Sequence, residues 1–183
     1  AAATEPLGAR GADMGWPAIA KILQRAAIPT AFEQLGGADR CLELARDYAL
    51  QREAFGRLIG QYQAVKHRLA DVYVANELAR SNAYYGAWAL DCAPVDTAAR
   101  EGAAHEIALA ATVSRISATE AFERAARDNT QTHGGISATW AHDAHLYYRR
   151  ARHLAVLLGT GAQWRDQMID LLGNDTRRRA SAA

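Results

Sequence analysis

Two arginines, an aromatic ring and a glutamine gather in the stretch YALQREAFGRLIGQYQ, residues 48–63. Arg52, Phe55, Arg57 and Gln63 stand on either side of a glycine. An arginine can bind a diphosphate through two parallel hydrogen bonds, and an aromatic ring offers a flat apolar face. The stretch therefore suits the binding of a nucleotide cofactor, although an ordinary turn between helices with solvated arginines would have the same composition.

A second stretch that could bind a ligand is QTHGGISATWAHDAHLYYRRAR, residues 131–152. Gly134 and Gly135 permit a close approach of the backbone to a ligand or to another helix. Gln131 and Thr132 precede them and are available as polar contacts.

The histidines of this second stretch could be considered as metal ligands. His142 and His145 are three residues apart, which places them on one face of a helix, and Asp143 lies beside them. No H-E-x-x-H pattern or third ligand accompanies them, so we expect structural, hydrogen-bonded histidines and no metal site.

A third stretch, LAVLLGTGAQW at residues 154–164, places Gly159, Thr160 and Gly161 after an apolar run. A strand followed by G-x-G is how a dinucleotide-binding loop begins. That fingerprint needs a third glycine where the helix packs against its strand, and Trp164 stands in that place. We therefore do not expect a phosphate-binding loop here.

The composition indicates which elements position these residues. The chain has 183 residues, of which 50% are hydrophobic, and β-branched residues are sparse, which favours one all-α domain. Its 21 Lys and Arg residues nearly balance 20 Asp and Glu residues. The net charge gives no field that would attract nucleic acid or an anionic membrane, so neither is expected as a partner.

Cysteine content and hydropathy indicate the compartment. The two cysteines, Cys41 and Cys92, lie within or beside helical patterns and lack metal-ligand spacing. No apolar run approaches the roughly 20 residues of a membrane span. We expect a reduced, cytoplasmic protein.

The apolar residues recur at helical spacing in several segments. The first segment starts at Trp16 and is interrupted by Pro29, where we expect a bend or a break, and by Gly36 and Gly37. Further helices are predicted over 63–90, 96–127, 141–150 and 162–172. Long helices joined by short turns predict an up-and-down four-helix bundle with a short extra helix over 16–173. We expect a disordered linker or tag remnant over 1–15 and a disordered tail over 174–183.

Together, YALQREAFGRLIGQYQAVKHRLAD and QTHGGISATWAHDAHLYYRRAR resemble the two signature regions of the C-terminal helical domain of acyl-CoA dehydrogenases. The resemblance runs from about Ile19 to Leu172. It implies an enzyme that also has an N-terminal helical domain and a middle β domain, that forms a dimer or a dimer of dimers, and that holds FAD between subunits. We expect this chain to be an isolated C-terminal domain that, by itself, neither binds FAD tightly nor oxidises an acyl-CoA.

The resemblance also implies which residues contact FAD in the intact protein. Arg52 is similar to the arginine that meets the FAD diphosphate across the dimer interface, and Phe55 to the aromatic residue near the cofactor. The other implied FAD contacts are Ile59, Tyr62, Gln63, Gln131, Gly134, Gly135 and Thr160. Arg115 takes the place of a basic residue that is usual in the third helix of the family.

The two positions at which the family carries its catalytic base hold apolar residues in this chain. The family's reaction removes the α proton of an acyl-CoA with a carboxylate while the β hydride passes to flavin. Most members place this glutamate where Leu158 stands, and others where Ala26 stands. The nearest acids, Glu33 and Asp166, lie one to two turns away or more, so no catalytic residue is assigned.

These departures favour a subunit that contributes FAD contacts and an oligomer interface while a partner subunit supplies the glutamate. Actinobacterial enzymes of steroid degradation are similar in having such paired subunits, and the ending GTGAQWRDQM resembles their base-lacking kind. The implied context is fatty acid or steroid side-chain degradation. Two alternatives remain open: a flavin monooxygenase or oxidase of the same superfamily, and a non-catalytic helical oligomerisation domain.

Overall fold

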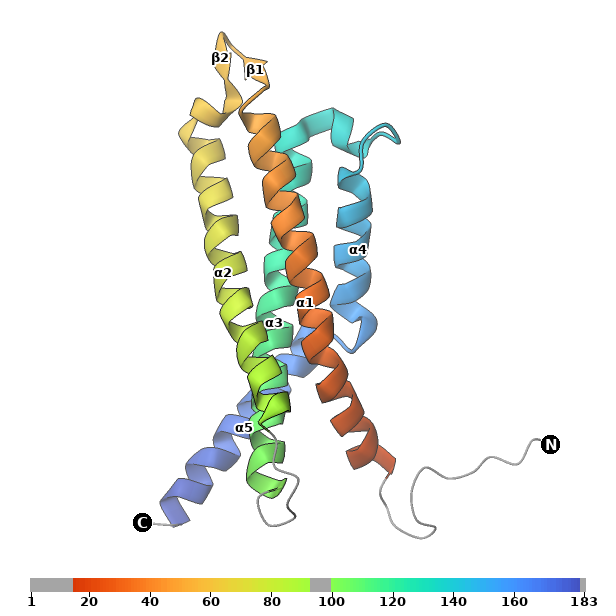
Figure 1. Cartoon of the computed structure of the whole chain (residues 1–183), viewed down its shortest axis with the longest axis vertical. Helices are drawn as coiled ribbons and strands as arrows, with labels where there is room; N and C mark the ends of the chain where they lie inside the picture. Colours follow the sequence, from red (N-terminus) through yellow and green to blue (C-terminus); the bar gives the residue numbers. More distant parts are fainter. Residues whose placement is uncertain (1–14, 93–99, 182–183) are drawn as a thin grey trace, which may run out of the picture.

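The computed structural model describes residues 15–92 and 100–181, and within these ranges the chain is almost entirely helical (Figure 1). The all-α prediction is therefore confirmed. The described elements, in chain order, are α1 (Gly15–Ala49), β1 (Glu53–Ala54), β2 (Arg57–Leu58), the 3-10 turn η1 (Ile59–Gln61), α2 (Gln63–Asp91), α3 (Arg100–His133), the 3-10 turn η2 (Gly134–Ala138), α4 (Ala144–Leu157) and α5 (Gly161–Ser181).

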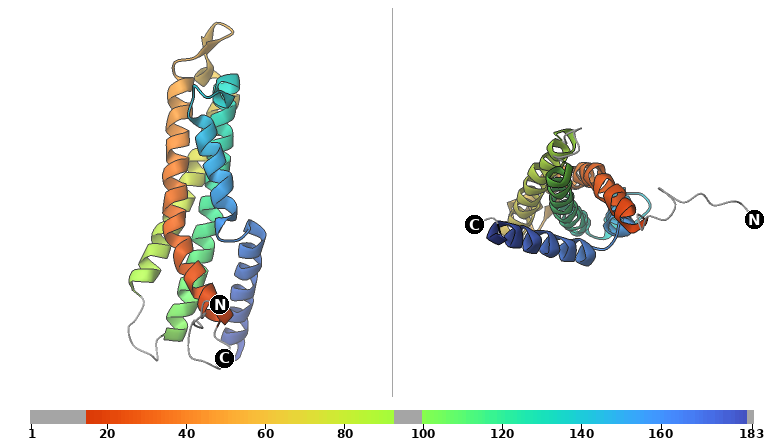
Figure 2. Two further views of the ribbon diagram at one scale, coloured as in Figure 1. Left: turned by 90° about the vertical axis from the view of Figure 1, so that its right-hand side faces the viewer. Right: turned by 90° about the horizontal axis from the view of Figure 1, so that it is seen from below.

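Helix α3 is the centre of the bundle and packs against each of the other four helices. Helices α1 and α2 lie side by side along it and are joined by the β1–β2 hairpin at one end of the molecule (Figure 1). Helix α4 packs against α1 and the C-terminal half of α3, and α5 continues along the N-terminal half of α3 (Figure 2). The two shorter helices thus share the fourth position of the bundle.

The helices pack closely because their buried positions are mostly alanine. Larger buried side chains such as Ile28, Phe122 and Leu154 are few. Small side chains let helix backbones approach, and the same alanines have the highest helix propensity. The buried alanines of α1, α2 and α3 include Ala27, Ala31, Ala38, Ala45, Ala79, Ala83, Ala110, Ala111, Ala118, Ala121, Ala125 and Ala126.

Helix α1 is continuous through Pro29, so of the two outcomes expected there a break is wrong. A proline inside a helix costs about 3 kcal/mol because it removes a hydrogen bond and crowds the preceding turn. On either side of it, Ile28 packs in a buried cluster with Ala111 and Trp164, and Ala31 packs in another. This burial outweighs the local cost. Gly36 and Gly37 do not interrupt the helix either.

Several boundaries differ from the sequence prediction. Helix α3 continues six residues past Arg127, to His133, whose ring packs between those of Tyr48 and His142. Helix α5 continues past Leu172 to Ser181, so the predicted tail over 174–183 starts as helix. The start expected for the third helix at Asp96, the turn residues after Cys92 and most of the predicted linker lie outside the described residues.

No helix in the described ranges is both long enough and apolar enough to cross a membrane. The division into a linker over 1–15, a bundle over 16–173 and a tail over 174–183 stays a prediction.

The two adjacent glycines of α1 provide a matched test of close packing. A Cβ on Gly37 would lie 2.4 Å from Cζ of Phe122, whereas a Cβ on Gly36 would meet nothing within 4 Å. We predict that Gly37→Ala lowers the free energy of unfolding by about 1–3 kcal/mol through overpacking. Gly36→Ala should raise it by up to about 1 kcal/mol through helix propensity. Urea denaturation of both variants checks this, and equal effects would contradict the packing account.

Candidate functional site

The β1–β2 hairpin carries an exposed aromatic side chain at one end of the bundle. Glu53 pairs with Leu58 and Ala54 with Arg57 in an antiparallel register. The turn between them consists of Phe55 and Gly56, with φ angles of 54° and 77°. Positive φ at both positions defines a type I′ turn, which favours Asn-Gly and is strained for a phenylalanine. The Phe55 side chain is 98% exposed, so nothing within residues 15–92 and 100–181 covers it.

Contacts from η1 and the start of α2 hold the hairpin in place. The Tyr62 hydroxyl donates a hydrogen bond to the Ala54 carbonyl oxygen at 2.9 Å. The Arg57 guanidinium lies 3.9 Å from the centroid of the Tyr62 ring, a cation–π contact. The Ile59 N–H donates to the Arg52 carbonyl oxygen at 2.8 Å. The backbone that carries Arg52 and Phe55 is therefore fixed relative to the bundle.

The two polar stretches meet at a hollow that we call the cofactor corner. Its volume is about 360 Å³, and Phe55, Ile59 and Tyr62 from the hairpin side face Gln131 and Thr132 from the end of α3. The remaining lining residues are Ala54, Ala64, Val65 and Arg68. Val65 and Arg68 were not singled out from the sequence as contacts. Val65 follows Tyr62 by three residues and Arg68 follows Val65 by three, which makes each pair neighbours on a helix surface.

The other predicted contact residues lie around this corner or away from it. Arg52 and Gln63 are exposed next to the hairpin but do not line the hollow. Gly134 and Gly135 are exposed at the start of η2, and Gly134 has a φ of 66°, which favours glycine. Thr160 is separate from the corner, because it lies between α4 and α5.

The histidines of the second stretch form a stack that supports the corner. The ring centroids of Tyr48 and His133, and those of His133 and His142, are each 4.3 Å apart. His133 Nδ1 hydrogen-bonds the Asn129 carbonyl oxygen at 2.9 Å, and burial is the main cause that lowers the His133 pKa. His142 Nδ1 accepts from the Ala144 N–H at 3.1 Å at the start of α4.

All three histidines of this stretch have hydrogen-bond partners within the fold. His145 also hydrogen-bonds within this segment, through Nδ1 and the His142 carbonyl oxygen at 2.8 Å. In the described part of the chain, no group of three or more His, Cys, Asp or Glu side chains could hold a metal ion. Sequence reasoning missed His133, whose position directly before the two glycines was the available signal.

A second hollow, which we call the loop hollow, lies at the junction of α4 and α5. It has a volume of about 640 Å³, with Trp16 and Leu23 from α1 facing Leu157, Leu158 and Trp164. Its remaining lining residues are Ala20, Gln24, Gly159, Gln163, Asp166, Gln167 and Asp170. The opening of α1 thus lies beside the α4–α5 loop.

Leu158 is packed into the protein at this junction. Its side chain lies against the buried cluster of Ala27, Ile28, Ala111 and Trp164. Trp164, the residue in place of a third glycine, donates from Nε1 to the Leu158 carbonyl oxygen at 3.1 Å. The tryptophan therefore anchors the loop instead of leaving room for a phosphate.

The α4–α5 loop is also held by a reciprocal helix cap. The Thr160 N–H donates to Gln163 Oε1 at 2.8 Å, and the Gln163 N–H donates to Thr160 Oγ1 at 3.3 Å. This is a capping box at the start of α5. The predicted contact residue Thr160 thus has a structural role in this loop.

The positions considered for a catalytic base differ in their surroundings. Ala26 immediately precedes the buried Ala27, so its position in α1 is near the cluster that Leu158 contacts. Asp166 lines the loop hollow from α5 and is exposed. Glu33 forms an ion pair with Arg150 on the surface. Neither of the two usual glutamate positions, at Ala26 and Leu158, carries a carboxylate.

The family model described as acyl-CoA dehydrogenase, C-terminal domain, matches residues 13–172. The chain is 43% identical over 137 residues to acyl-CoA dehydrogenase IpdE2 of Mycobacterium tuberculosis, covering 75% of this chain and 38% of that protein. It is 36% identical over 156 residues to acyl-CoA dehydrogenase FadE34 of the same organism, covering 84% of this chain and 20% of that protein. The chain thus spans well under half the length of these relatives.

Two solved structures share the helical fold of this chain. A variant of the Tcur3481-Tcur3483 steroid ACAD superposes with a TM-score of 0.71 at 30% identity, covering 83% of this chain and 39% of that chain. The ChsE4-ChsE5 complex from Mycobacterium tuberculosis superposes with a TM-score of 0.69 at 28% identity, covering 80% of this chain and 37% of that chain.

The strained turn at Phe55 gives a prediction about the stability of the fold. Asparagine tolerates positive φ better than phenylalanine, so Phe55→Asn should raise the free energy of unfolding by about 0.5–1 kcal/mol. Gly56→Ala, at the neighbouring φ of 77°, should lower it. Chemical denaturation measures both. A lower stability of Phe55→Asn would mean that the Phe55 ring packs within the fold.

Proposed function

Since the chain belongs to the acyl-CoA dehydrogenase family as its C-terminal domain, we propose that it supplies FAD contacts and an oligomer interface to a flavoprotein that dehydrogenates acyl-CoA thioesters. We further propose that a partner subunit supplies the catalytic base. The observation that carries the proposal is the pair of apolar residues, Leu158 and Ala26, at the two positions where the family has its glutamate.

The residues of the cofactor corner fit the chemistry of FAD. The hollow is lined mainly by apolar and aromatic side chains, with Arg68, Gln131 and Thr132 as polar groups. Arg52 is exposed beside it and is free to meet a diphosphate bidentately. Its proposed companions, Gln63, Gly134 and Gly135, are exposed at the same end of the bundle.

The exposure of Phe55 favours a cofactor held between subunits. A phenylalanine that is 98% exposed on a strained turn gains nothing for the stability of its own chain. Such a ring is suited to lie against a group carried by a neighbouring subunit. When bound, FAD would supply the hydride acceptor for the β carbon of the acyl group, and the residues of the cofactor corner would hold and orient it.

The loop hollow is the proposed place of the acyl group. Trp16, Leu23, Leu157 and Leu158 give it an apolar lining. Leu158 cannot accept a proton, but its side chain excludes water from the position that a carboxylate occupies in related enzymes. In the proposed pair of subunits, this chain shapes the site while the α proton passes to a carboxylate of the partner.

Exposed apolar side chains on α2 support an oligomeric protein. Val74, Leu78, Tyr84 and Trp88 are more than half exposed. Apolar patches of this kind mark protein interfaces. The solved relatives named as a steroid ACAD and as the ChsE4-ChsE5 complex support a hetero-oligomer in fatty acid or steroid side-chain degradation.

We further propose a cytoplasmic location, which the cysteines support. Cys41 is buried and Cys92 exposed, and both are free thiols. Burial raises the pKa of Cys41 to about 12, which keeps this thiol protonated and unreactive. Free thiols fit a reducing compartment.

Replacing Arg52 in the intact protein tests the cofactor assignment. Loss of a charge-assisted contact to a diphosphate costs about 1.5–3 kcal/mol, so Arg52→Ala should weaken FAD binding by about 10- to 100-fold. Flavin content is read from absorbance, and assembly from size-exclusion chromatography with light scattering. Assembly should not change.

The matched control is Arg46→Ala, which removes an exposed arginine that pairs with Asp47 in the last turn of α1. It should leave flavin content unchanged. Normal flavin content in Arg52→Ala, together with failed assembly, would contradict the cofactor role and favour an oligomerisation domain.

A further inference from the structure

Arg68 is the one charged side chain that lines the cofactor corner within the described ranges. It lies in the second turn of α2 and lines the hollow together with Gln131 and Thr132 at the end of α3. Arg52, the residue proposed to meet the diphosphate, is exposed beside the hollow and does not line it. The corner therefore holds a cation in addition to the one that the proposed function uses.

A carboxylate on α3 holds Arg68 only loosely. Nη1 of Arg68 lies 3.7 Å from Oδ1 of Asp128, which is beyond the length of a hydrogen bond. The Arg68 side chain is 42% exposed, compared with 15% for Asp128. An exposed ion pair of this kind contributes little to stability. The guanidinium of Arg68 can therefore turn to a ligand without breaking a hydrogen bond to Asp128.

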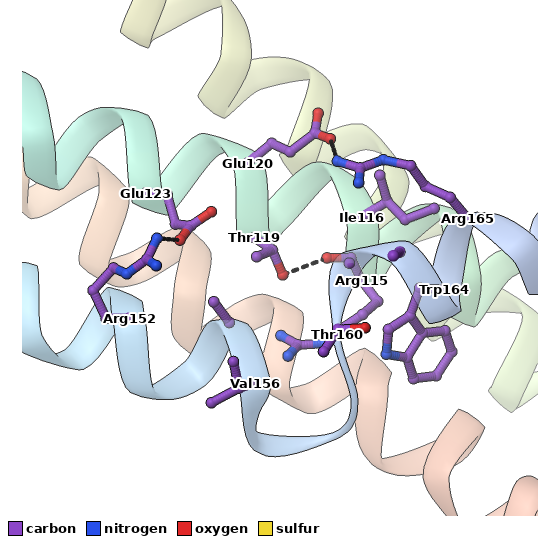
Figure 3. A pocket seen from close by; sticks show the side chains of 13 residues that line it. Arg115, Ile116, Thr119, Glu120, Glu123, Arg152, Val156, Thr160, Trp164 and Arg165 are labelled. Carbon is purple, nitrogen blue, oxygen red and sulfur yellow. Dashed lines mark hydrogen bonds and ion pairs between the residues drawn. The ribbon is translucent and has the colours of Figure 1, made fainter.

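The arginines that line a hollow between α3, α4 and α5 have closer partners than Arg68 (Figure 3). Arg165 Nη2 lies 2.5 Å from Glu120 Oε1. The buried Arg115 donates from Nη1 to Gln34 Oε1 at 2.8 Å and from Nη2 to a carbonyl oxygen of α4, while its buried Nε has no partner in the described ranges. These side chains are fixed by contacts within the fold, whereas Arg68 is not.

The charged groups around Asp128 leave a surplus of positive charge beside the corner. The carboxylate of Asp128 interacts with three arginines, Arg68, Arg124 and Arg127. Burial is the main cause that raises the Asp128 pKa, and the three arginines act against it. Asp71 is the second carboxylate of this group and lies 3.9 Å from Arg124. Three arginines and two carboxylates leave one net positive charge.

The helix ends at the corner do not change the sign of this charge. Ala64 and Val65 line the hollow from the first turn of α2, and Gln131 and Thr132 line it from the last turn of α3. The start of a helix is partly positive and the end of a helix is partly negative, so the two contributions oppose each other. The arginines therefore determine that the hollow favours an anionic group.

We propose that Arg68 binds a phosphate of the FAD diphosphate inside the cofactor corner, as a second cation besides Arg52. This inference rests on the proposed function, because it takes FAD as the molecule in the corner. The diphosphate is doubly charged, so one arginine leaves it half neutralised, and a guanidinium suits phosphate oxygens. When Arg68 turns to the phosphate, Arg124 and Arg127 still compensate Asp128.

Titration of FAD into the apo form of the intact protein, in the assembly in which it purifies, tests the proposal through flavin fluorescence. Arg68→Met should weaken FAD binding by about 10-fold, because a charge-assisted contact is lost. Arg68→Lys keeps the charge and should recover most of the affinity. The matched control is Arg124→Met, which removes an exposed arginine that interacts with Asp128 but does not line the hollow. It should bind FAD normally.

Salt separates a contact to phosphate from a structural effect, because ions screen exposed charge pairs. The affinity ratio between the unsubstituted protein and Arg68→Met should fall towards one at about 1 M salt. A ratio that persists at high salt would overturn this inference. Equal affinities of Arg68→Met and Arg124→Met, while Arg52→Ala loses flavin, would also overturn it but leave the proposed function standing. Absence of FAD binding by the unsubstituted protein would overturn both.

Discussion

The close approach of α1 and α2 to the central helix α3 is the constraint on which the rest of the structure depends. Alanines and Gly37 line these contacts, and a Cβ on Gly37 would lie within 3 Å of the Phe122 ring. Because interiors packed in this way do not deform continuously, the elements at the ends of the bundle have fixed positions. The hairpin with Phe55 and the loop with Leu158 are both held by such packing, at different places along the same helices.

The sequence predicted the helical class, the bundle and the family, since these depend on alanine content, helical spacing and two long motifs. It left open whether α1 bends or breaks at Pro29, because the burial of Ile28 and Ala31 against other helices is not a local property. It placed Gln131 and Phe55 in one site only through the resemblance. The unpaired Nε of Arg115 depends on neighbours from α1 and α4 that are 81 and 39 residues away, which no local pattern reveals.

We propose that this chain contributes cofactor contacts and that a partner subunit contributes the catalytic base, because of the residues at the hairpin and at the α4–α5 loop. In an isolated bundle, the strained turn at Phe55 lowers stability and the exposed Arg52 contributes nothing to it. Both residues are suited to contact a cofactor shared with a neighbouring subunit. Leu158 lies at the proposed acyl site with its side chain packed on apolar residues and its carbonyl bound by Trp164. In the proposed account, the loop shapes the acyl site while Leu158 offers no group that could accept a proton.

Exchange of the acyl α proton for deuterium tests this central claim most directly, because the step needs a carboxylate but no hydride transfer. We would measure it by mass spectrometry with the intact, FAD-loaded protein, purified without a second subunit, and a panel of straight-chain and branched acyl-CoA thioesters. The account predicts no exchange above the solvent rate for the unsubstituted protein and for Leu158→Gln, and measurable exchange for Leu158→Glu. Exchange by the unsubstituted protein alone, at a rate equal to that of Leu158→Glu, would contradict it.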